Sequence, residues 1–167
     1  MTTLVTPVWF GQFGLDLGKK VHDLSSDTLK LGLITTGPSL SFSLADPRWG
    51  SGGSTDLSAY QVSTAGTSYT GPITLQYSAG GAGSQSWALS TGVPQLKLDI
   101  VTIAQDASGP SNIYAGIIFN DTAAGKQACG YVPIDAGGNG TIVDDQMVIR
   151  WNNGSPYVAF QLPQYSA

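Results

Sequence analysis

The chain has 167 residues, a net charge of −4 and only 11% charged residues, and its length is that of one domain. Its seven basic residues are scattered and form no positive face, which argues against nucleic-acid binding. The single cysteine, Cys129, excludes an intrachain disulfide and is expected to be a small buried side chain. No apolar run reaches the ~18 residues that a membrane span needs. A surface this poor in charge suits assembly, because ions are costly to desolvate at an interface.

The first elements of the chain are predicted to be an extended arm and a helix. The arm covers residues 1–8. Over residues 9–24, apolar side chains recur at spacings of three and four, which predicts an amphipathic helix. These side chains are Phe10, Phe13, Leu17, Val21 and Leu24. Gly11, Gly14 and Gly18 weaken such a helix by up to about 1 kcal/mol each, so it depends on packing against the rest of the chain.

A strand and a long irregular passage are expected next. The polar residues Ser25–Asp27 end the helical period, and the alternation over Leu29–Thr36 then predicts a strand with one covered face. The passage Gly37–Ser58 is rich in glycine and proline, and loops of this length are usually functional or mobile. Trp49 lies inside it without periodic neighbours. Two interpretations of Trp49 remain open, an anchor for a partner or a plug over the core.

Short strands follow, separated by turn residues at regular intervals. They are expected at Tyr60–Ser63, Ile73–Tyr77, Ser86–Leu89, Leu96–Ile103, Ile113–Asn120, Gln127–Ile134, Gln146–Trp151 and Tyr157–Leu162. The last two flank an Asn-Asn-Gly-Ser-Pro sequence, which predicts a hairpin. The fold class is therefore predicted to be mainly β, a single antiparallel β-sandwich or jelly-roll-like domain over residues 9–167 with one N-terminal α-helix.

Residues with catalytic or metal-binding chemistry are few. His22 is the only histidine, the chain has no glutamate, and His22 is expected to cap the helix or face solvent. Asp135–Asp145 is the one plausible calcium loop, but Ile142 stands where the calcium repeat has aspartate, and a glycine turn is expected. Asp144 and Asp145 are adjacent and would point to opposite faces of a strand. We therefore expect no enzymatic activity, no cofactor and no metal.

One segment resembles a known family. Lys20–Lys30, KVHDLSSDTLK, is similar to a K-V-H-x-L-x-S-D-T-L-K segment of small structural proteins encoded near the capsid genes of tailed bacteriophages. Shorter matches follow in the same order, at Gly66–Gly71, at Tyr114–Thr122 and in a final hairpin over Met147–Phe160. The resemblance implies a non-enzymatic virion protein, made in the host cytoplasm and bound to the head shell as a decoration or cement protein.

The resemblance also implies a partner, the major capsid protein, with copies of the chain itself as a further candidate. Neither nucleic acid nor a membrane is expected. Apolar side chains in the irregular segments are the expected contacts, since exposed apolar clusters and aromatic anchors mark interfaces. They are Leu4, Val5, Val8, Trp9, Phe42 and Trp49. The alternative is a tail or fibre β-domain that binds a host glycan on an aromatic platform, since the chain has four tryptophans and seven tyrosines.

Overall fold

The structure, a computed structural model, describes residues 2–78, 86–90, 92–151 and 158–161. Its strands are β1 (Thr2–Val5), β2 (Val8–Trp9), β3 (Leu29–Ile34), β4 (Pro47–Arg48), β5 (Thr55–Asp56), β6 (Ile73–Thr74), β7 (Ser86–Ser90), β8 (Val93–Lys97), β9 (Val101–Ile103), β10 (Ala115–Asn120), β11 (Ala128–Pro133), β12 (Met147–Trp151) and β13 (Val158–Gln161). The helices are α1 (Gly11–Gly18) and a 3-10 turn at Ser58–Tyr60. The predicted fold class, mainly β with one N-terminal helix, is confirmed.

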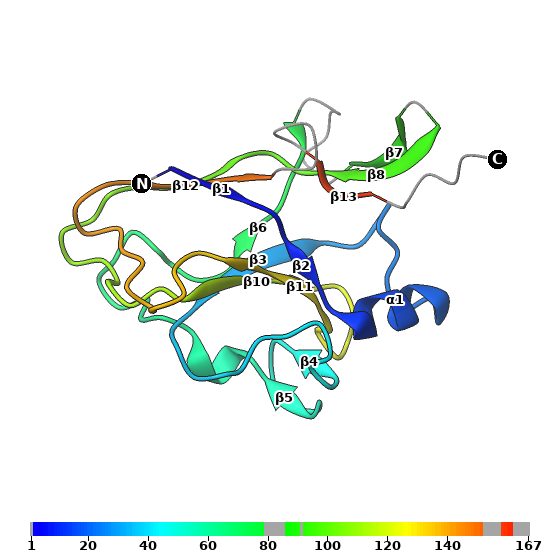
Figure 1. Ribbon diagram of the computed structural model, residues 1–167, viewed down its shortest axis with the longest axis horizontal. Helices are drawn as coiled ribbons and strands as arrows, with labels where there is room; N and C mark the ends of the chain where they lie inside the picture. Colours follow the sequence, from blue (N-terminus) through cyan, green and yellow to red (C-terminus); the bar gives the residue numbers. More distant parts are fainter. Residues whose placement is uncertain (1, 79–85, 91, 152–157, 162–167) are drawn as a thin grey trace.

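The sheets form layers and do not close into a barrel. A five-stranded antiparallel sheet has the order β2-β11-β10-β3-β6. Two three-stranded sheets, β1-β12-β9 and β13-β8-β7, lie over one of its faces, above it in Figure 1. The small parallel pair β4-β5 lies on the opposite side, and α1 lies at one end of the layers.

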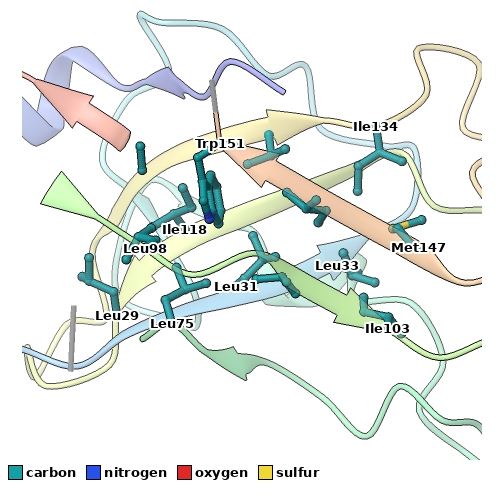
Figure 2. Packing of buried hydrophobic residues seen from close by; sticks show 14 of the residues in the cluster. Leu29, Leu31, Leu33, Leu75, Leu98, Ile103, Ile118, Ile134, Met147 and Trp151 are labelled. Carbon is teal, nitrogen blue, oxygen red and sulfur yellow. The ribbon is translucent and has the colours of Figure 1, made fainter. Parts of the chain in front are cut away.

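The main core fills the space between the five-stranded sheet and the two smaller sheets (Figure 2). Leu29, Leu31 and Leu33 point into it from β3, as the predicted alternation requires, and each is fully buried. Trp151 enters from β12 on the other side, and its indole N–H donates to the Asp99 carbonyl at 2.7 Å. We call this cluster the inner core.

The other face of the five-stranded sheet is also covered. Gly32 and Ile34 of β3 point to this face and are buried, so the strand has two covered faces rather than the one predicted. The irregular segment Gly37–Tyr60 supplies the cover, and its Trp49 lies parallel to Phe119 of β10 with ring centroids 5.0 Å apart. We call this second cluster the outer core.

The helix is shorter than predicted. α1 covers Gly11–Gly18, whereas the apolar period extends over residues 9–24. Beyond its end, Lys20 adopts a left-handed φ of 59°, and the Val21 N–H donates to the Asp16 carbonyl at 2.9 Å. Three glycines make propagation costly, so the chain turns back after two helical turns and continues as an irregular segment.

Two predicted strand assignments and one predicted hairpin are also wrong. The predicted strand Tyr60–Ser63 is not formed. Tyr60 ends the 3-10 turn, and Gln61 after it makes an isolated bridge to Ile34 of β3. Leu96–Ile103 is divided between β8 and β9, which belong to different sheets. The final hairpin is wrong because β12 pairs with β1 and β9, whereas β13 pairs with β8; its turn, residues 152–157, lies outside the described residues.

The predicted N-terminal arm takes part in a sheet. The main chain of Thr2–Val5 forms β1, which runs parallel to β12 and pairs with Val148–Trp151. Within the described residues, no helix has the length and the apolar character required to cross a bilayer.

Candidate interaction surface

An apolar hollow of about 540 Å³ lies beside α1. Its walls come from α1 itself, from β2, β7 and β13, and from the segment that follows β3. Every described residue that lines the hollow is aromatic, aliphatic or glycine. They are Trp9, Phe10, Gly11, Phe13, Gly14, Leu17, Phe42, Trp87 and Phe160. We call this site the α1 hollow.

Aromatic rings packed against one another form the base of the α1 hollow. The ring centroids of Trp9 lie 5.0 Å from those of both Phe13 and Phe160, and Phe13 meets Phe160 edge-on at 5.5 Å. Trp87 stacks on Phe160 with ring centroids 6.1 Å apart. Because these rings already pack against one another, the surface is ordered before binding. The side chains therefore lose little conformational entropy when a partner binds.

Phe42 stands at the rim of the α1 hollow and is 65% exposed. Its carbonyl accepts the Gly11 N–H at 2.8 Å, which holds the segment against the start of α1. A Cβ at Gly11 would lie 3.0 Å from the Phe42 ring, closer than ordinary van der Waals contact. The glycine therefore lets the ring lie against the helix while most of its surface faces solvent.

A smaller, more polar hollow of about 430 Å³ adjoins the α1 hollow and shares Leu17 and Trp87 with it. Lys20, His22 and Asp23 contribute the polar groups. The Asp23 carboxylate accepts hydrogen bonds from the hydroxyls of the two following serines and from one of their backbone N–H groups, and these bonds lower its pKa. Asp23 thus holds its own turn together.

His22 is buried, contrary to the prediction of a capping or solvated side chain. It lies past the end of α1, is only 5% exposed and packs on Phe13 with ring centroids 5.2 Å apart. Its Nδ1 lies 3.0 Å from the Asn120 amide nitrogen at the end of β10. Burial lowers the pKa of His22 below its usual 6.5, although the negative charges of Asp16 and Asp27 act to raise it.

The residues predicted as partner contacts lie in several places. The main chains of Leu4 and Val5 pair with β12, and Val8 lies in β2 against β11. Trp9 and Phe42, which are 33 positions apart in the sequence, both line the α1 hollow. The structure therefore brings two of the predicted residues together at one solvent-facing site.

Trp49 lies elsewhere, in the outer core, and is 7% exposed. A Cβ on Gly32 would lie 2.3 Å from its indole ring, so the absence of a side chain at Gly32 makes room for Trp49. Of the two interpretations left open by the sequence, the structure supports a plug over the core.

The sequence did not single out several residues of the α1 hollow. Phe13 and Leu17 carry a local signal, since they belong to the helical period, but this period predicts only that they face the protein. Trp87 and Phe160 carry no local signal, because β7 and β13 reach α1 only through the folding of the whole chain.

The side chains that could bind a metal do not gather at one point in the described part of the chain. No group of three His, Cys, Asp or Glu side chains there is arranged to hold a metal ion. Asp135 Oδ1 accepts the N–H groups of Gly137 and Asn139, as in the predicted glycine turn. The Cys129 thiol is fully buried, as predicted, and burial raises its pKa far above the usual value.

The comparisons with known proteins add no relative to this description. Neither the models of protein families, nor the curated proteins, nor the solved structures contain a match to this chain.

Proposed function

We propose that the protein is a non-enzymatic structural component of a tailed-phage virion, a decoration or cement protein that binds the head shell. The observation that carries the proposal is the α1 hollow, an ordered apolar site with an aromatic side chain, Phe42, at its rim. Exposed apolar clusters mark interaction sites, and aromatic side chains are favoured as anchors there. The resemblance of Lys20–Lys30 to phage structural proteins supplies the biological setting.

The partner in this proposal is the major capsid protein. An apolar side chain of the shell, inserted among Trp9, Trp87 and Phe160, would exchange solvent contact for aromatic contact at a site that needs little reordering. Each copy would bury a small area. Many copies bound to one shell would together stabilise the particle, because weak contacts that are repeated many times add up in an assembly.

A glycan-binding module of a tail or fibre remains the second candidate. The observation in its favour is the adjoining hollow, where Trp87 lies near Lys20 and Asp23 and thus combines a ring face with polar groups. The larger α1 hollow offers a sugar few hydrogen-bonding side chains, since its described lining is apolar. We therefore place the decoration function first.

The proposal is tested on purified particles of the phage that encodes the chain. Densitometry against the major capsid protein should give a copy number comparable to that of the shell. A few copies per particle would contradict a head position and favour the tail module.

A matched pair of variants tests the α1 hollow itself. Phe42→Ser should leave the free energy of unfolding within about 0.5 kcal/mol of wild type, because the ring is mostly exposed, yet lower retention on particles. Leu89→Ser is the control, since Leu89 is 73% exposed on β7 and does not line the hollow. Wild-type retention of Phe42→Ser, or equal loss in both variants, would remove the hollow from the contact.

A further inference from the structure

Polar side chains from three parts of the chain lie largely out of solvent beside the smaller polar hollow, which His22 lines. Asp16 projects from α1 and His22 from the segment after it, and both are 5% exposed. Asn120, at the end of β10, is fully buried, and Asp27 is half-buried in the turn before β3. Polar groups are costly to bury, so their hydrogen bonds decide whether this arrangement is stable.

Two backbone groups fix the orientation of the Asn120 amide. Its Oδ1 accepts the N–H groups of Thr122 and Ala123, each at 3.0 Å. Backbone N–H groups only donate, so the oxygen of the amide must face them. The amide NH₂ must therefore face the opposite way, toward His22 Nδ1 at 3.0 Å and Asp27 Oδ2 at 2.5 Å.

The orientation of Asn120 in turn fixes the protonation state of His22. An amide NH₂ only donates, so His22 Nδ1 must accept and carries no proton. The imidazole of the folded protein is thus neutral, with its proton on Nε2. Protonation of Nδ1 would set an N–H against the Asn120 NH₂, break this hydrogen bond and leave a buried cation.

The charged groups around His22 do not compensate for this loss. Asp16 on α1 and Asp27 in the turn favour the imidazolium, but the cost of desolvating the cation outweighs them. Asp27 Oδ2 already accepts the Asp23 N–H at 2.7 Å in addition to the Asn120 NH₂. The buried Cys129 thiol on β11 has a raised pKa and is neutral, and Lys20 lines the same hollow as His22.

We infer that the cluster of His22, Asn120 and Asp27 is a pH-sensitive tie, which holds the segment after α1 to the end of β10 at neutral pH and releases it on acidification. The residues after α1 line the smaller hollow, which shares Leu17 and Trp87 with the α1 hollow, so loosening the tie would alter the edge of the proposed docking surface. The tie itself concerns the free chain and does not depend on the identity of the partner.

The sign of the pH dependence follows from the direction of the shift. The folded protein holds His22 with a pKa below that of the unfolded chain, about 6.5. Its contribution to stability is therefore complete above pH 6.5 and is lost as the pH falls through the folded pKa. Over this window the unfolding equilibrium constant should rise by up to about tenfold per pH unit, the slope for uptake of one proton.

Urea unfolding of the full chain between pH 7.5 and 5 tests the inference. His22 is the only histidine, and His22→Asn keeps an acceptor near the position of Nδ1 without titrating. Wild type should lose stability over this range, whereas His22→Asn should lose much less. Titration of the N-terminal amine and the carboxylates is common to both proteins. Equal pH slopes would overturn the inference.

A second measurement on the wild-type protein decides the matter even if His22→Asn fails to fold. The ¹⁵N chemical shifts of the His22 imidazole should show the neutral tautomer protonated at Nε2, with a titration midpoint below 6.5. After correction for the intrinsic pH dependence of amide exchange, the protection of residues 20–28 should fall on acidification more than the protection of β10. A proton on Nδ1 at neutral pH, or a midpoint at or above 6.5, would overturn the inference.

Discussion

The two faces of the five-stranded sheet are covered in different ways. Over the inner core, strands of two smaller sheets close the space, and side chains alternate from both layers (Figure 2). Over the outer core, the cover is the irregular segment Gly37–Tyr60, whose only strands are the two-residue β4 and β5. One sheet thus supports a regular core on one side and a core closed by a loop on the other.

The outer core shows what an irregular segment needs in order to cover a sheet. Its backbone polar groups must be paired, and the Trp49 N–H donates to the Lys126 carbonyl at 2.9 Å while the Leu57 N–H donates to Arg48 at 2.8 Å. Its apolar contact comes from the buried Trp49, which lies over Gly32, from the fully buried Leu57, and from three partly buried side chains, Leu40, Leu44 and Tyr60. In the inner core, the apolar contact is made by many side chains from regular strands. The free energy of unfolding should therefore respond differently to substitutions in the two cores.

The largest expected effect is at Trp151 in the inner core. Trp151→Ala removes a fully buried indole and leaves the Asp99 carbonyl without its donor, so the free energy of unfolding should fall by about 3–5 kcal/mol. Urea unfolding measures the loss. The exposed neighbour Arg150 is the control, and Arg150→Ala should stay within about 0.5 kcal/mol of wild type. A loss below about 1 kcal/mol at Trp151 would show that the inner core is not the main source of stability.

A smaller and more local effect is expected at Trp49. Trp49→Ala should cost about 3 kcal/mol, near the lower end for a buried aromatic, because the covering segment can relax into the vacated space. Hydrogen exchange should accelerate over Gly37–Tyr60 much more than in β12. Unchanged stability together with loss of particle retention would instead restore Trp49 as a partner anchor.

The smallest effects compare two glycines and have opposite signs. Gly32→Ala sets a methyl group against the Trp49 indole and should cost about 1–3 kcal/mol. Gly14 lines the α1 hollow and is exposed there, and a Cβ on it meets nothing within 4 Å. Gly14→Ala should therefore stabilise the chain by up to about 1 kcal/mol.

A double-mutant cycle sharpens the comparison of the two cores. If the indole is the reason for glycine at position 32, the cost of Gly32→Ala should largely disappear in the Trp49→Ala background. An unchanged cost in that background would show that the strand β3, and not its cover, requires the glycine.

Local patterns in the sequence were sufficient for the fold class and for several elements. The alternation at Leu29, Leu31 and Leu33 places these side chains in the inner core, because a period of two is a property of any extended chain. The helical period located α1 and the burial of Phe13, but Phe10 lies just before the helix and packs in the outer core. The length was overestimated because the turn at Lys20 carries no strong signal.

Only the tertiary structure decided which elements meet. Four features depend on contacts between residues far apart in the chain. They are the division of Leu96–Ile103 between two sheets, the placement of β12 and β13 in different sheets, the burial of His22 against Asn120 and the assembly of the α1 hollow. The spacing of apolar residues shows which side of a helix or strand they share. It does not determine the partner of that side, because pairing and burial depend on the free energy of the whole chain.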